Sequence, residues 1–166
     1  MTKRAGLLLN SAILFLFVFL SPGYVKAEDL KIESIELKSS NWEALGSYLE
    51  IKGDGRYIAY TVRAGREEGE RKTGRIDPAR MSELIRYIES ADFYAFKEEY
   101  RFPPYSRQGT NIELTIVSDK GIKRIRFYLH NDGSQEAVPQ GLIGITERIY
   151  HSINMSKSQR LSYENI

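Results

Sequence analysis

Few side chains in this sequence could do chemistry at neutral pH. The two histidines are His130 and His151, and an imidazole is the side chain that acts as a base there without a shifted pKa. Neither histidine lies in a nucleophile motif, no His-x-x-x-His or Glu-x-x-His spacing is present, and the chain has no cysteine. The sequence therefore predicts no catalytic residue, no metal site and no cofactor.

Carboxylates offer one alternative to histidine as catalytic groups. Glu98 or Glu99 could supply one acid of a glycosidase pair, with Asp132 or Glu113 as its partner. A solvated helix end explains the two adjacent glutamates more simply. A non-catalytic protein is the prediction, and a small envelope hydrolase that uses carboxylates is the alternative.

One loop combines aromatic side chains with arginines, between Arg101 and Gly109. Two consecutive prolines stiffen it, so ordering it on a partner would cost little conformational entropy. Aromatic residues and arginines are the types that anchor interfaces. The candidate binding residues are Arg101, Phe102, Tyr105 and Arg107, and the expected partner is an envelope protein, peptide or glycan. The alternative is that Phe102 and Tyr105 cap the core.

The first 27 residues have the layout of a secretory signal peptide. A basic start at Lys3 and Arg4 precedes an apolar run from Leu7 to Leu20, and helix breakers and small residues follow up to Ala27. We expect cleavage after Ala27 and a periplasmic or secreted bacterial protein. The apolar run is shorter than the roughly 20 residues of a spanning helix. An uncleaved signal anchor, which would make the protein membrane-associated, is the alternative.

Composition narrows the classes of partner. Of the 24 basic and 22 acidic residues, three basic ones lie in residues 1–27, which leaves 21 against 22 in the rest of the chain. A near-neutral domain has no general electrostatic case for nucleic acid, and a membrane is a partner only if the leader is retained. Without cysteine there is no disulfide, so the hydrophobic core must hold the fold alone.

The stretch from Ile76 to Tyr100 predicts an amphipathic helix followed by an aromatic segment. Asp77 is a good N-cap, and Pro78 suits the first helical position. The apolar side chains recur at helical spacing. The expected core cluster comprises Leu84, Ile88, Phe93, Phe96, Leu114, Ile125 and Phe127.

Alternating patterns on either side of this helix predict strands. Residues 30–37 have a phase slip at Ser34, which fits an edge strand with a bulge or a flexible lead-in. A hairpin over 47–62 turns at Gly53-Asp54-Gly55, where Asp-Gly favours a type I′ turn. In this hairpin we expect Ile58, Tyr60 and Val62 to share the face of Leu49 and Ile51.

Further strands and a second helix complete the pattern. A charged hairpin tip leads to a strand near 71–76, and a second hairpin spans 110–129. Pro139 opens a second helix with apolar positions at Leu142, Ile145, Ile149 and Ile153. The predicted fold class is α+β, an antiparallel sheet of five to six strands with both helices packed on one face. Residues 28–153 form one domain, and 154–166 form a polar C-terminal tail.

The order of these elements resembles a group of small exported bacterial domains of unknown function, over about Gly46 to Ile153. The motifs that carry the resemblance are Tyr48 with its strand, the Gly-Asp-Gly turn, Ala91-Asp92-Phe93 through Glu99-Tyr100, the Thr110 strand, the Lys120-Gly121 turn and Pro139. Many relatives carry a cysteine pair and a proline before the tyrosine, which residues 44–47 here lack. The resemblance implies the fold and export, and it implies no catalytic residues.

Overall fold

The computed structural model describes residues 30–41, 45–100, 109–130 and 138–154. The chain begins with four strands, β1 (Ile32–Ser40), β2 (Leu45–Lys52), β3 (Arg56–Arg63) and β4 (Arg66–Arg75). Helix α1 (Pro78–Ser90) and a short 3₁₀ turn, η1 (Phe93–Ala95), follow. The chain ends with β5 (Glu99–Tyr100), β6 (Gly109–Ser118), β7 (Gly121–His130) and α2 (Gln140–Ser152).

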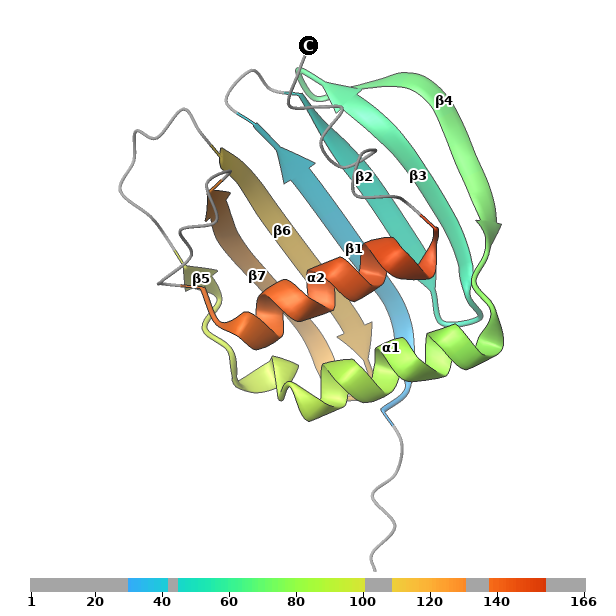
Figure 1. Cartoon of the computed structure of the whole chain (residues 1–166), viewed down its shortest axis with the longest axis vertical. Coiled ribbons are helices and arrows are strands. Elements are labelled where there is room, and N and C mark those ends of the chain that lie inside the picture. Colours follow the sequence, from blue (N-terminus) through green and yellow to red (C-terminus); the bar gives the residue numbers. More distant parts are fainter. Residues whose placement is uncertain (1–29, 42–44, 101–108, 131–137, 155–166) are drawn as a thin grey trace, which may run out of the picture.

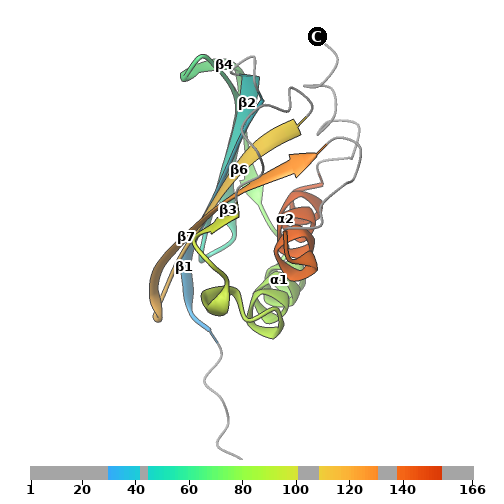
Figure 2. The ribbon, with the colours of Figure 1, turned by 90° about the vertical axis from the view of Figure 1, so that its left-hand side faces the viewer.

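The strands form one sheet in the order β4-β3-β2-β1-β6-β7-β5. Both helices cover the same face, and none of the described residues forms a helix on the other face (Figures 1 and 2). The predicted α+β class and the placement of the helices are therefore confirmed. The sheet has seven strands rather than five or six. The additional strand is β5, whose two residues pair parallel with β7, and two residues are too few to leave a periodic signal.

Strand β1 lies in the middle of the sheet and not at its edge. It pairs antiparallel with β2 on one side and with β6 on the other. The predicted bulge is present, as a register shift between Ile32 and Ser34. Ile35 and Leu37 are fully buried. An edge strand was the wrong expectation because pairing on both sides is a property of the whole sheet, which residues 30–37 do not encode.

The phase predicted for β3 is also wrong. Leu49 faces Ala59 and Ile51 faces Tyr57 across the β2–β3 ladder, so Ile58 points to the helix-free face. The turn is not type I′ either, because of its three residues only Gly55 has a positive φ, at 84°. The amide of Gly55 donates to Lys52 O at 2.8 Å. This is the hairpin with a three-residue loop and a glycine at the left-handed position, and the extra residue shifts the phase of β3.

The two-residue turn with left-handed residues occurs one hairpin later. Ala64 and Gly65 have φ values of 47° and 76° and join β3 directly to β4. Strand β4 therefore starts at Arg66, five residues before the expected strand. Ala64 holds a conformation that a residue with a Cβ adopts only at a cost.

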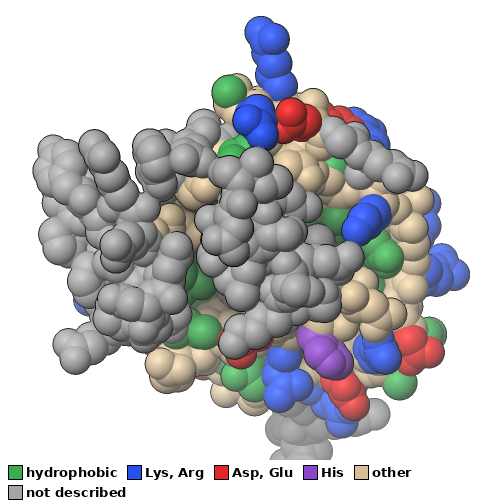
Figure 3. All heavy atoms as spheres, turned by 45° about the horizontal axis from the view of Figure 1, so that its top comes forward, with side chains coloured by type: hydrophobic (Ala, Val, Ile, Leu, Met, Phe, Trp, Pro, Cys, Tyr) green, Lys and Arg blue, Asp and Glu red, His purple; other side chains and the backbone are tan. Residues whose placement is uncertain are grey.

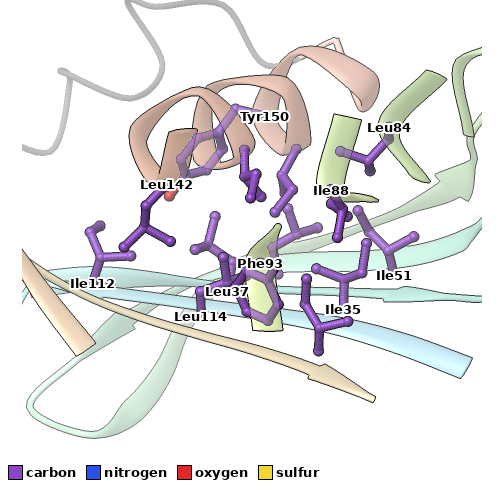
Figure 4. Close-up of a cluster of buried hydrophobic side chains, with 14 of the residues drawn as sticks. Ile35, Leu37, Ile51, Leu84, Ile88, Phe93, Ile112, Leu114, Leu142 and Tyr150 are labelled. Atoms are coloured by element: carbon purple, nitrogen blue, oxygen red, sulfur yellow. The ribbon is translucent and has the colours of Figure 1, made fainter. Parts of the chain in front are cut away.

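The start of α1 is as predicted. The Asp77 side chain accepts from the backbone N–H groups of Ala79 and Arg80, and Pro78 occupies the first turn. The helix presents Met81, Leu84 and Ile88 to the sheet. The predicted cluster forms one core with β1, β2 and α2, in which Phe96 is partly buried (Figure 4).

The two helices approach closely because α2 has a glycine where they meet. A Cβ on Gly144 would lie 2.1 Å from the hydroxyl of Tyr87 in α1. One turn further along α2, the Arg148 guanidinium lies over the Tyr87 ring at 4.2 Å. Gly144 lowers the intrinsic helix propensity of α2. The close contact with Tyr87 explains why a glycine occupies this position.

Truncation of the core should be severe. We expect Leu84→Ala or Phe93→Ala to lower the free energy of unfolding by about 2–5 kcal/mol, through lost burial and the cavity left behind. The side chains are 2% and 1% exposed. Urea unfolding measures the loss, and Glu83→Ala on the exposed side of the same helix is the control. Equal midpoints for the Leu84 variant and this control would contradict the packing.

Relieving the left-handed alanine should stabilise the protein. Asparagine adopts positive φ more readily than alanine and is favoured in type I′ turns. We expect Ala64→Asn to raise the free energy of unfolding by about 0.5–1 kcal/mol. Lys72→Asn, on an exposed position of β4, is the control in the same urea titration. A lower midpoint for Ala64→Asn would contradict the turn geometry.

Candidate functional site

The candidate loop lies outside the residues that the structure describes. Arg101, Phe102, Tyr105 and Arg107 all fall within 101–108, so their role stays a prediction. Asp132 and the side chain of His130 are outside the described part as well. Of the remaining candidates, His151 is exposed on α2, and Glu99 and Glu113 lie on β5 and β6. No three of the described histidine and acidic side chains are grouped so that they could hold a metal ion.

The helix-free face of the sheet carries an aromatic pair that the sequence analysis did not identify. Tyr48 on β2 and Tyr60 on β3 are opposite each other in the ladder. Their rings stack, with centroids 4.8 Å apart and planes at 24°. The Lys38 ammonium lies 5.8 Å from the centroid of Tyr48, and the Arg71 guanidinium lies 5.3 Å from that of Tyr60. The strand order places one cation on each side of the pair.

An ionic series continues from Lys38 toward the other edge of the sheet. The Lys38 ammonium is 3.7 Å from Glu113 Oε1 on β6. Arg126 on β7 donates from Nε to Glu113 Oε2 at 2.9 Å, and Arg124 Nε is 3.8 Å from Glu113 Oε1. Glu99 on β5 is in register with Arg126. Three cations therefore surround one half-buried carboxylate.

These contacts form one continuous line across all seven strands. We call it the transverse row: Arg71, Tyr60, Tyr48, Lys38, Glu113, Arg126 and Glu99. The sequence analysis did not predict this row. Its members come from seven separate strands, so only the register of the ladders aligns them.

Two glutamates beside the row affect Tyr48. Glu36 and Glu50 face each other across the β1–β2 ladder, and each is ion-paired with a lysine two residues along its own strand. Partial burial raises the pKa of Tyr48 to about 12, and the negative charges of Glu36 and Glu50 contribute to this rise. The Tyr48 hydroxyl is therefore a proton donor throughout the physiological range.

The carboxylates of the row are poorly arranged for hydrolysis. Glu113 and Glu99 lie on the same face with Arg126 between them in the register. A catalytic acid is typically set in apolar surroundings or beside a second carboxylate, whereas Glu113 is surrounded by cations. The surroundings of Glu113 therefore differ from those typical of a catalytic acid.

Charges of both signs are mixed on the described surface of the helix-bearing side that Figure 3 shows. Figure 3 presents this side with its upper end brought forward, and basic and acidic side chains are interspersed along the lower and right margins of the described surface. The helix-free face and its transverse row are thus the stronger candidate for recognition.

The comparisons with known proteins add no family. No protein-family model matches the chain, and no curated protein has a significantly similar sequence. The resemblance to small exported domains stays a prediction.

Ionisation of Tyr48 should destabilise the fold at high pH. A tyrosine titrates near 10.0 when unperturbed and Tyr48 at about 12 in the fold. Between these values the unfolded chain loses the proton first, so the free energy of unfolding falls as pH rises from 10 to 12. The fall should be smaller in Tyr48→Phe, whereas Tyr57→Phe, on the opposite face of β3, serves as the control. Identical urea midpoints against pH for all three proteins would contradict the environment assigned to Tyr48.

Proposed function

We propose that the protein is an exported, non-catalytic domain that binds a protein, peptide or glycan partner in the bacterial envelope. The observation that carries this proposal is the transverse row on the helix-free face. None of the described helices covers that face, whereas the two helices bury the other. Tyrosine and arginine, the types enriched at binding hot spots, supply four of the seven side chains of the row.

The ring contacts favour a protein or peptide over a glycan. Sugars bind aromatic side chains through a free ring face. Tyr48 and Tyr60 stack on each other, and a cation lies over each of them. A partner would therefore meet ring edges, the Tyr48 hydroxyl and charged side chains. These groups suit the polar surface of a protein or an extended peptide.

Loss of the row should abolish capture of the partner. Wild-type protein and the double variant Tyr60→Ala, Arg126→Ala would be used to pull down proteins and glycans from envelope extract. We expect the variant to lose the partner while the free energy of unfolding falls by about 1 kcal/mol or less per site, as at surface positions generally. Lys72→Ala, on β4 but outside the row, is the matched control. Equal recovery by all three proteins would contradict the assignment of the face.

A second double variant separates this face from the loop. Phe102→Ala, Tyr105→Ala should leave capture intact if the sheet face is the binding surface. Loss of capture with an unchanged melting temperature would move the site to the loop. A collapse of the melting temperature would assign both aromatic residues to the core. Turnover of generic glycoside or peptide substrates by the wild type would instead favour the envelope hydrolase.

A second candidate, a signal-anchored protein, is favoured by the way the fold holds the chain at Leu30. The backbone N–H of Leu30 donates to Glu89 Oε1 at 2.6 Å, and the side chain is 4% exposed. Only residues 28 and 29 separate this position from the expected cleavage site. A peptidase must bind residues on both sides of the bond that it cuts, so a folded domain would hinder cleavage. None of the described helices has the length and apolar character needed to span a bilayer.

Weakening the contact between Leu30 and Glu89 should increase cleavage after Ala27 if folding of the domain competes with the peptidase. The intact mass of the protein from its native envelope reports whether residues 1–27 are retained. We expect Glu89→Ala to raise the cleaved fraction, because Leu30 loses its acceptor, and Glu83→Ala on the same helix to leave that fraction unchanged. Complete cleavage of the wild type would eliminate the anchored form.

A further inference from the structure

The point at which the chain enters the fold is fixed by the β6–β7 turn. The backbone N–H of Lys31 donates to Asp119 Oδ1 at 3.3 Å, and the backbone N–H of Asp119 donates to Lys31 O at 3.1 Å. Together with the Glu89 contact, these bonds place Leu30 and Lys31 between the end of α1 and this turn. The described part of the chain therefore begins, at Leu30, next to the turn that contains Asp119.

Other turns lie at the same end of the sheet. The Gly53 amide donates to Glu33 O at 2.8 Å, and the Ile76 amide donates to Gly55 O at 2.9 Å. We call this the leader-exit end, the lower end of the sheet in Figure 1. Exposed basic and acidic side chains both lie there. The basic ones are Lys31, Lys52, Arg56, Arg75 and Lys120, and the carboxylates include Glu33, Asp54, Asp77 and Asp119. Arg56 and Arg75 are ion-paired with Asp54, and Lys52 is ion-paired with Glu50.

This end also carries an unusual hydrophobic side chain. Ile122 is 73% exposed. Among the described residues it is the only large hydrophobic side chain with this degree of exposure. It lies just after the turn that holds Lys31, with Lys120 two residues before it. An isolated exposed isoleucine is ordinary on a protein surface. Its position beside the exit of an apolar leader, among basic residues, is what needs an explanation.

We propose that the leader-exit end docks on an anionic phospholipid surface, with Ile122 inserted at the interface and Lys31 and Lys120 among the headgroups. The proposal rests on the second candidate function, in which the leader is retained. Nine residues separate Leu20 from Leu30, and they span at most about 30 Å when fully extended. A leader inserted in the bilayer would therefore hold this end, and not the opposite one, close to the membrane.

The chemistry of the surface fits a lipid interface. An apolar side chain flanked by lysines is the pattern that lies in the headgroup region of anionic membranes. A short tether raises the effective concentration of the surface, so a weak contact is sufficient. Docking at this end would make the strands point away from the membrane surface. The transverse row would then stay accessible to a partner.

The test uses the full chain, synthesised without signal peptidase in the presence of vesicles of phosphatidylglycerol and phosphatidylcholine. The chain has no cysteine, so a single introduced thiol takes one fluorophore. Glu33→Cys places the dye at the leader-exit end, and Arg66→Cys places it at the far end of β4. Quenching by a headgroup-labelled lipid reports proximity. The docking variant is Ile122→Ser, Lys120→Glu, and Lys72→Glu is the control for charge reversal.

We expect stronger quenching at position 33 than at position 66. That difference should shrink to what the tether alone produces in the docking variant and in 1 M salt, which screens the lysines, and should be unchanged in Lys72→Glu. Equal quenching at the two positions in chains that float with the vesicles would overturn docking while the anchor stands. A difference that is undiminished in Ile122→Ser, Lys120→Glu would overturn docking through these side chains and leave only the tether or contact through another surface. Chains that do not float would overturn the anchor and the docking together.

Discussion

The structure depends on the burial of one face of the sheet around strand β1. Ile35 and Leu37 have no exposed surface, and hydrogen-bonded strands on both sides satisfy the β1 backbone. The chain has no disulfide to limit its unfolded states, so the helices must exclude water from this face by packing alone. The close approach of Tyr87 to Gly144 is one consequence, because α1 and α2 have to cover the same side of the sheet.

One-sided cover leaves the other face to be stabilised by side chains. The transverse row does this by alternating the character of its members from strand to strand, so that each charge or ring meets a complementary neighbour. Cross-strand pairs of this kind each contribute a few tenths of a kcal/mol, roughly. The same arrangement presents ring edges, a hydroxyl and several cations in fixed positions. A surface that holds its own side chains in place has little conformational entropy left to lose when it binds.

The connection between the fold and the leader is unusually direct. Glu89 lies in the last turn of α1, where a negative charge opposes the helix dipole. Glu89 accepts a hydrogen bond from the Leu30 amide, and this bond explains why a glutamate occupies the last turn of α1. The described domain therefore begins at Leu30, three residues after the predicted end of the leader at Ala27.

The sequence by itself determined those elements whose signal is local. The cap at Asp77, the apolar face of α1, the β6–β7 hairpin with its two faces and the one-sided α+β arrangement all follow from periodicity and turn residues. Only the tertiary structure decided the rest. Both alternating sets of side chains in β3 include apolar residues. The three-residue loop that ends at Gly55 sets the register that turns Tyr57 and Ala59 toward the core. The central position of β1, the pairing of β5 and the transverse row depend on register between distant strands, which no single segment encodes.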